Sequence, residues 1–266
     1  MEANCPKVSI ITVTLNCELT IRETVESVLK QSYKNIEHII VDGLSSDKTL
    51  DIVEEYRPQY CGRLKIISEQ DSGIYDAMNK GVKLSSGVYV YFLNSGDYFY
   101  DQNVLRFLEQ YFSDDYDLII GTVIRIYKGY CVNIEGDLEK LHIGKMPPHQ
   151  GSFIRRSIFE ALNGYNVKYR SSGDIDFFCK LYFSKHSYIK INNIIAYMPS
   201  GGMSSNKSIS VNESFMVISR YYGKYHAYIY YLNKMILEQG IKRILLFLGL
   251  RGLYEKLLKV KLLHIE

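Results

Sequence analysis

The sequence predicts an α/β fold with a mainly parallel β-sheet. Over the first 100 residues, short runs rich in Val, Ile and Tyr alternate with stretches whose apolar residues recur with the period of a helix. The first run, Val8–Thr14, is β-branched and almost uninterrupted, as expected of a parallel strand that is covered on both faces. Strands and helices that alternate in this way form parallel strands joined by right-handed crossovers.

Four strands and three helices are expected in this first part of the chain. The expected strands are Val8–Thr14, Ile36–Val41, Leu64–Ile67 and Val88–Leu93. The first helix is expected after Thr20, because Thr20 and Glu23 have the spacing of a capping box and apolar residues follow at helical intervals. Asp47 is expected to cap the second helix, and the third is predicted over Ile74–Leu84.

The pattern changes after residue 100 and indicates a mixed second half. The elements expected there are helices at Gln102–Phe112, Ser157–Leu162 and Asp174–Phe183, and strands at Leu118–Tyr127, Tyr130–Ile134 and Tyr188–Tyr197. From Ser208 onward the pattern is helical, with breaks near Gly223 and Gly240. We therefore expect one domain over residues 1–205, divided into halves at 1–100 and 101–205, and a helical region at 206–266.

The charge is distributed unevenly along the chain. The 266 residues carry a net charge of +3, but residues 241–266 hold six basic and two acidic side chains, a net +4, so the other 240 residues sum to −1. A neutral body argues against a nucleic-acid-binding protein, whose affinity would come largely from neutralising phosphates. We expect no nucleic acid partner.

The cysteines and the apolar stretches indicate a cytoplasmic location. The five cysteines are odd in number and include no C-x-x-C pair, which favours reduced thiols over a disulfide framework or a zinc site. The polar first seven residues lack the pattern of a signal peptide. The longest strongly apolar run, Ile244–Leu250, is too short to span a bilayer. We expect any membrane contact to be peripheral.

Polar residues follow three of the predicted strands and mark a ligand site. These clusters are Thr14 to Asn16, Asp42 with Gly43, and Asn94 to Asp97. Ligands of open α/β sheets bind at the carboxyl ends of the strands. Neither a G-x-G-x-x-G sequence after the first strand nor a P-loop sequence is present, which disfavours ordinary dinucleotide and P-loop binding. Asp42 suits a base or ribose and Asp97 a divalent ion on a diphosphate, although each could simply cap its own turn.

Motifs of a recognisable kind follow one another along the first 100 residues, over the segments Val8–Asn16, Glu26–Tyr33, Glu37–Thr49, Glu69–Gly81 and Gly87–Asp97. Shorter ones occur at His149–Arg156, Gly173–Asp174 and Gly201–Ser204. In this order they closely resemble the motifs of family 2 glycosyltransferases with the GT-A fold. The resemblance implies a Rossmann-like, mainly parallel sheet, with residues 1–100 as the half that binds a nucleotide sugar and 101–205 as the acceptor half of a catalytic domain.

The resemblance also implies a nucleoside-diphosphate-sugar donor, usually a UDP-sugar. Residues that match the family's nucleotide contacts are Val13, Thr14, Leu15, Asp42 and Asp71, and Ser95 lies in the loop expected to contact the donor. The family usually carries Asp-x-Asp where this chain has the segment from Asn94 to Asp97. We therefore expect Asp97 to be the main metal ligand and Asn94 a second one, with Mg²⁺ or Mn²⁺ as the ion because both favour oxygen ligands.

Asp174 matches the family's position for the general base. An inverting transfer needs one carboxylate on the face opposite the leaving group, to take the proton of the attacking hydroxyl. Asp176 is the nearest rival, but residues two apart on a helix face different directions, and Asp174 could also be an ordinary helix N-cap. His149 is expected to line the acceptor or diphosphate pocket, and Arg155 and Arg156 could meet phosphate or simply be solvated.

The basic, leucine-rich tail suits an anionic membrane surface, although packing on the domain or on another subunit fits it equally. We therefore expect an inverting, metal-dependent hexosyltransferase that acts at the inner face of a bacterial plasma membrane. It would move a sugar from a UDP-sugar to a polyprenyl-diphosphate-linked saccharide in O-antigen or capsule biosynthesis. A homo-oligomer is left open.

Two other functions are compatible with the sequence. The missing first Asp of the metal motif favours a non-catalytic protein that binds sugar nucleotides or acts as a membrane scaffold. A sugar nucleotidylyltransferase would share a nucleotide-sugar fold, but its expected Gly-rich, basic N-terminal loop is absent.

Overall fold

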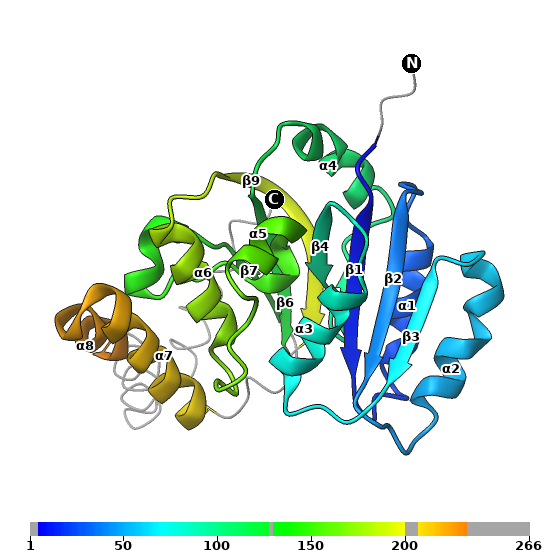
Figure 1. Ribbon diagram of the computed structural model, residues 1–266, viewed down its shortest axis with the longest axis horizontal. Helices are drawn as coiled ribbons and strands as arrows, with labels where there is room; N and C mark the ends of the chain where they lie inside the picture. Colours follow the sequence, from blue (N-terminus) through cyan, green and yellow to red (C-terminus); the bar gives the residue numbers. More distant parts are fainter. Residues whose placement is uncertain (1–4, 128–129, 200–206, 233–266) are drawn as a thin grey trace.

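The computed structural model describes residues 5–127, 130–199 and 207–232. These residues form a nine-stranded sheet with the order β3-β2-β1-β4-β8-β6-β9-β5, and β7 pairs with β6 (Figure 1). The strands are β1 Val8–Thr14, β2 Ile36–Asp42, β3 Leu64–Ser68, β4 Tyr89–Phe92, β5 Tyr98–Phe99, β6 Leu118–Tyr127, β7 Tyr130–Ile134, β8 Ser152–Arg155 and β9 Tyr188–Pro199.

Helices cover both faces of the sheet. They are α1 Ile21–Leu29, α2 Thr49–Glu55, α3 Ile74–Leu84, α4 Val104–Ser113, α5 Arg156–Ala161, α6 Gly173–Phe183, α7 Lys207–Tyr222 and α8 Lys224–Leu232. Short 3-10 helices occur at η1 Arg57–Tyr60, η2 Leu138–Ile143 and η3 His149–Gly151. Figure 1 shows α7 and α8 at the opposite end of the molecule from α2.

The predicted parallel half is confirmed. β1 pairs in parallel with β2 and β4, and β2 pairs in parallel with β3. Every residue of β1, β2 and β4 is buried, as the apolar runs predicted. The second half is mixed, also as predicted: β8 runs antiparallel to both β4 and β6, while β6 and β9 are parallel. Because β8 reverses direction between them, β4 and β6 end at the same edge of the sheet as β1 and β2.

Alternate strand residues point to opposite faces of the sheet, so a hydrophobic core lies on each face. The two cores hold the helices against the sheet. On one face Ile11 and Val41 pack with residues of α3, α5, α6, α7 and α8. On the other, Ile10 and Ile40 pack with residues of α1, α2 and α4. An α/β sandwich of three layers results.

Several local expectations were incomplete or wrong. β5 and β8, of two and four residues, were not predicted. The expected capping box is wrong: no side chain caps α1, and the Thr20 hydroxyl instead faces the Cys17 carbonyl oxygen at 3.5 Å. Asp47 does accept hydrogen bonds at the start of α2, from the backbone nitrogen of Thr49 at 3.0 Å and its hydroxyl at 2.5 Å. The break at Gly223 is confirmed, with φ +85°, whereas Gly240 and the basic tail at 241–266 lie outside the described residues.

Within the described ranges, no helix is long and apolar enough to cross a membrane. All five cysteines fall in these ranges, and all five are free thiols, as expected.

A buried carboxylate ties the amino edge of the sheet to the turn after α3. Glu37 on β2 is 2% exposed. One of its oxygen atoms accepts from the Ser9 hydroxyl at 2.7 Å and from the Ser86 backbone nitrogen at 2.6 Å, and the other pairs with Lys65 Nζ at 2.8 Å. Burial alone would raise the pKa of Glu37, but the hydrogen bonds from Lys65, Ser9 and Ser86 outweigh it and lower the pKa to about 2.

We predict that Glu37→Gln lowers the free energy of unfolding at pH 7 by about 2–3 kcal/mol, because charged hydrogen bonds are lost and buried donors are left unpaired. Since the folded-state pKa lies below that of the unfolded chain, this contribution is complete above about pH 4.5 and is lost as the pH falls toward about 2. Urea unfolding of both proteins between pH 3 and pH 7 measures it.

The matched control is Glu69→Gln, which breaks a half-exposed ion pair with Lys80 and should cost at most about 1 kcal/mol. Equal losses for the two variants at pH 7 would show that Glu37 has no special structural role.

Candidate functional site

Three loops meet where β1, β2 and β4 end, at the lower edge of the sheet in Figure 1. The backbone nitrogen of Gly43, after β2, donates to the Thr14 carbonyl oxygen at 2.9 Å. The backbone nitrogen of Ser95, after β4, donates to the Val13 carbonyl oxygen at 3.2 Å. The polar clusters found in the sequence are therefore neighbours, held together by main-chain hydrogen bonds.

Leu15 and Asp71 flank Gly43 at one end of this edge. A Cβ atom added at Gly43 would lie 2.7 Å from Asp71 Oδ2 and 3.6 Å from Leu15 Cδ1. Any larger residue at position 43 would therefore displace the Asp71 carboxylate. Leu15 is 55% exposed, and Asp71 is fixed because its Oδ1 accepts from the Gly73 nitrogen at 2.9 Å. An exposed apolar side chain beside a carboxylate suits a ligand in which a planar ring, such as a base, is joined to a group that carries hydroxyls, such as a ribose.

Asp42 is buried behind this surface. Its carboxylate accepts from the Ser45 backbone nitrogen at 2.9 Å, from the Ser45 hydroxyl, and from the Ser68 hydroxyl at 2.7 Å. Val13 and Thr14 are also buried. In this structure Asp42 shapes the loop after β2, and a ligand at its carboxylate would compete with three hydrogen bonds.

Asp97 is the carboxylate of the loop after β4, and it is only 6% exposed. Its Oδ2 accepts a hydrogen bond from Gln150 Nε2 at 2.9 Å. Burial raises the pKa of Asp97 to about 6, although the hydrogen bond from Gln150 acts in the opposite direction. The Thr24 hydroxyl on α1 fixes the backbone of the loop, because it donates to the Asp97 carbonyl oxygen at 2.8 Å and accepts from the Gly96 nitrogen at 2.9 Å.

A continuous set of contacts joins this loop to the predicted base. Asn94 Nδ2 lies 3.1 Å from His149 Nε2, and His149 Nδ1 lies 3.5 Å from Asp174 Oδ2. Because the amide nitrogen can only donate, Nε2 of His149 is the acceptor and Nδ1 carries the proton, facing Asp174. The structure thus brings together Asn94, His149 and Asp174, which are far apart in the sequence.

Unpaired oxygen atoms lie on the same edge. Thr14 Oγ1, Asn94 Oδ1 and Ser95 Oγ are buried and have no hydrogen-bond partner among the described residues. Buried polar atoms are normally paired, so these three atoms are free to bond to a ligand or to a water molecule. Asn94 Oδ1 and the Asp97 carboxylate are oxygen donors of the kind that Mg²⁺ and Mn²⁺ prefer. Within the described ranges no three His, Cys, Asp or Glu side chains gather into a metal site, so the loop could supply only part of a coordination shell.

The two carboxylates at the start of α6 have different surroundings. Asp174 is 19% exposed and lies at the second residue of the helix, so it is not the N-cap. Asp176 is fully buried, pairs with Lys180 Nζ at 3.0 Å and accepts from the Tyr221 hydroxyl at 3.3 Å. Asp176 therefore holds α6 against α7, and Asp174 is the carboxylate that faces the site.

Two arginines named in the sequence point elsewhere. β8 runs antiparallel to β4, so its last residue, Arg155, lies at the far edge of the sheet, opposite Tyr89. It pairs there with Asp115 at 2.7 Å. Arg156 donates to the Gly87 carbonyl oxygen and pairs with Glu160, both at 3.0 Å. The expectation that these arginines could meet phosphate at the site is wrong.

Three residues of the site were not singled out from the sequence. Gln150 contacts Asp97, Thr24 fixes the loop after β4, and the Tyr75 hydroxyl donates to Asp174 Oδ1 at 3.0 Å. Gln150 and Tyr75 lie inside motifs that carry the family resemblance, which is the signal that could have found them. No sequence pattern marks Thr24.

Comparisons with known proteins identify the family and the fold. The family model described as "Glycosyl transferase family 2" matches residues 9–186. A Mycobacterium bovis protein named "PGL/p-HBAD biosynthesis glycosyltransferase" is 31% identical over 204 residues, covering 75% of this chain and 80% of its own length.

Two solved structures share the fold. One is S. aureus TarS 1-349 in complex with UDP-GlcNAc, with a TM-score of 0.68, 20% identity, and coverage of 86% of this chain and 72% of that one. The other is the mannosyltransferase PcManGT from Pyrobaculum calidifontis in complex with GDP-Man and Mn²⁺, with a TM-score of 0.65, 16% identity, and coverage of 85% and 70%. With the family model matching well over half of its residues, this chain belongs to glycosyl transferase family 2 and is a glycosyltransferase with the GT-A fold.

Proposed function

We propose that this glycosyltransferase is inverting and metal-dependent, and that it moves a sugar from a UDP-sugar to a lipid-linked saccharide. The observation that carries the proposal is the path from Asn94 through His149 to Asp174. It places a partly exposed carboxylate one histidine ring away from the loop expected to hold the diphosphate. In this proposal residues 1–100 bind the donor, residues 101–205 bind the acceptor, and residues 206–266 form a helical region.

The donor is proposed to lie across the carboxyl edge of β1, β2 and β4. Leu15 and Asp71 would contact the base and ribose, with Asp42 holding the loop beneath them. Thr14 and Ser95 offer unpaired hydroxyl groups to the donor. TarS, a structure of the same fold in complex with UDP-GlcNAc, supports a UDP-sugar, and PcManGT, in complex with GDP-Man, makes a GDP-sugar the alternative for the donor screen.

Asp97 and Asn94 are proposed to hold Mg²⁺ or Mn²⁺ together with the donor diphosphate. Asn94 Oδ1 is buried and unpaired, which fits an oxygen ligand, and PcManGT, which has the same fold, is in complex with Mn²⁺. A bound divalent ion would neutralise the charge that develops on the leaving nucleotide. Gln150 would orient the Asp97 carboxylate.

Asp174 is proposed to accept the proton of the acceptor hydroxyl as that oxygen attacks the anomeric carbon. His149, whose Nδ1 lies 3.5 Å from Asp174 Oδ2, would line the acceptor pocket beside the base. Because one carboxylate acts from the side opposite the leaving group, the configuration at the anomeric carbon inverts. Asp176 cannot serve, because it is buried in ion pairs.

The acceptor is proposed to be a polyprenyl-diphosphate-linked saccharide at the inner face of a bacterial plasma membrane, in O-antigen or capsule biosynthesis. The net +4 charge and the leucines of residues 241–266 support contact with an anionic surface.

Asp174→Asn should lower the rate of UDP release from the UDP-sugar substrate by about 10²- to 10⁴-fold, because an amide cannot accept the proton. The affinity for UDP, measured by calorimetry, should stay unchanged. The donor is chosen beforehand by screening a panel of UDP-sugars and GDP-sugars with the unmodified enzyme.

The control for this test is Asp176→Asn, which breaks the buried pair with Lys180. It should lower the melting temperature while the folded enzyme keeps most of its turnover. Full activity of Asp174→Asn, or loss of activity in folded Asp176→Asn, would rule out the assigned base.

Removal of divalent ions with EDTA should abolish UDP release, and Mn²⁺ or Mg²⁺ should restore it. Asp97→Asn should also weaken Mn²⁺-dependent UDP binding by at least about tenfold, because an anionic oxygen ligand is lost. Calorimetry with UDP, with and without Mn²⁺, measures this without turnover. Asp101→Asn, an exposed change a few residues along the same segment, should have no effect, and UDP affinity that is independent of Mn²⁺ would contradict metal binding.

Replacing Lys256, Lys259 and Lys261 by Gln should reduce binding to vesicles of phosphatidylcholine with phosphatidylglycerol by at least about tenfold, since each lysine near an anionic surface contributes about 1 kcal/mol. Co-sedimentation at low and high salt measures the binding. Gln at the exposed Lys83, Lys168 and Lys185 removes the same charge from the body and should leave binding intact. Equal losses for both triple variants would argue against a membrane role of the tail.

A further inference from the structure

We propose that Tyr75 is the positioning residue of the catalytic base: it holds one oxygen of Asp174 so that the other faces the acceptor. This inference rests on the proposed role of Asp174 as general base. It adds a residue of α3, on the donor side of the sheet, to the part of the site that acts on the acceptor.

The hydrogen bonds of Asp174 are divided unequally between its two oxygen atoms. Oδ1 accepts from the Tyr75 hydroxyl at 3.0 Å and from the Ile175 backbone nitrogen at 2.9 Å. Among the described residues, Oδ2 faces only His149 Nδ1, at 3.5 Å, which is beyond the usual range of an N–H···O hydrogen bond. Oδ1 is thus held in place, and Oδ2 is the oxygen that can approach an incoming hydroxyl.

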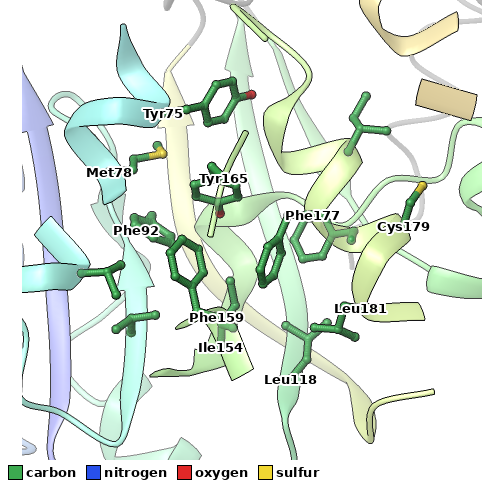
Figure 2. Close-up of a cluster of buried hydrophobic side chains, with 14 of the residues drawn as sticks. Tyr75, Met78, Phe92, Leu118, Ile154, Phe159, Tyr165, Phe177, Cys179 and Leu181 are labelled. Carbon is green, nitrogen blue, oxygen red and sulfur yellow. The ribbon is translucent and has the colours of Figure 1, made fainter. Parts of the chain in front are cut away.

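The ring of Tyr75 is fixed on both sides. It is 5% exposed, and its centroid lies 5.2 Å from that of Tyr165. A Cβ atom added at Gly173 would lie 2.8–2.9 Å from three atoms of the ring, so the start of α6 packs directly on it. Figure 2 shows Tyr75 at the margin of the aromatic cluster, with its oxygen directed away from Phe92 and Phe159. The hydroxyl therefore has a defined direction, toward the residue that follows Gly173.

The Tyr75 hydroxyl keeps its proton at any working pH. Burial, together with the negative charge of Asp174, raises the pKa of Tyr75 well above its usual value. It therefore acts as a constant hydrogen-bond donor to a carboxylate. Such a bond is stronger than one between neutral groups and sets the orientation of the carboxylate plane.

The same helix connects this contact to the donor end of the site. Asp71, the proposed ribose contact, accepts from the Gly73 nitrogen immediately before α3 begins. Tyr75 is the second residue of that helix. A single short segment therefore positions groups at both ends of the proposed reaction.

Tyr75→Phe tests the inference against a closely matched control, Tyr165→Phe. Both changes remove one hydroxyl from neighbouring buried rings of the same cluster. The Tyr165 hydroxyl has no hydrogen-bond partner among the described residues, so only Tyr75→Phe breaks a contact. We expect kcat for UDP release to fall by about 10- to 100-fold in Tyr75→Phe, as for a misplaced catalytic group. KM for the UDP-sugar and UDP affinity should be unchanged, and Tyr165→Phe should behave as the unmodified enzyme.

Gly173→Ala is a second route to the same result. Its methyl group would displace the Tyr75 ring while the hydroxyl is retained, so kcat should fall with little change in UDP affinity. It keeps the inference testable if Tyr75→Phe does not fold. Melting temperatures of all variants show which proteins are folded.

The double variant Tyr75→Phe with Asp174→Asn separates this inference from the proposed function. If Tyr75 acts through Asp174, the double variant should be no slower than Asp174→Asn alone, within about twofold. Normal kcat in Tyr75→Phe, equal losses in Tyr165→Phe, or independent losses in the double variant would overturn the positioning role. Full activity of Asp174→Asn would instead overturn the proposed base.

Discussion

The contact between Asn94 and His149 joins the two halves of the site. Asn94 ends the parallel half of the sheet, at the carboxyl end of β4, and His149 begins the segment that leads into the antiparallel strand β8. Since β8 pairs with β4 on one side and β6 on the other, the histidine is held beside β4 by the sheet itself. A loop without strand pairing would not fix the position of the histidine relative to Asn94. Asp174, at the start of α6, is positioned by a separate contact, the packing of Gly173 on the ring of Tyr75 of α3.

The parts of the fold that the sequence predicted well are those with long, regular patterns. β1, β6, β7 and α3 have the predicted bounds, because each is long enough for apolar residues to mark its period. β5 and β8 are defined by their partners instead: two and four residues become strands only because β9, β4 and β6 offer hydrogen bonds. The capping box at Thr20 failed because the same local pattern allows a turn that bonds Thr20 and Ile21 to the Cys17 carbonyl oxygen.

The candidate site, like the fold, could be predicted only in part. Individual side chains such as Asp97 and Asp174 were predicted because motifs mark them, but their partners are set by tertiary contacts across long sequence separations. Gln150 reaches Asp97 over 53 residues, and Tyr75 reaches Asp174 over 99. For Arg155 the error was of another kind: from the sequence it was expected to be able to contact a phosphate at the site. The reversed direction of β8 carries it to the far edge, where its guanidinium pairs with Asp115.

Position 94 shows why an amide can replace the carboxylate that the family usually has there. An asparagine can do two things at once: its nitrogen donates to His149 Nε2, while its oxygen stays unpaired and buried at the site. A carboxylate at position 94 could only accept a hydrogen bond from Nε2, so a second anionic group would stand beside the histidine that faces Asp174. With the amide, Asp174 is the one carboxylate that faces the ring of His149 among the described residues. The departure from Asp-x-Asp therefore agrees with the proposed base and does not by itself indicate a catalytically silent protein.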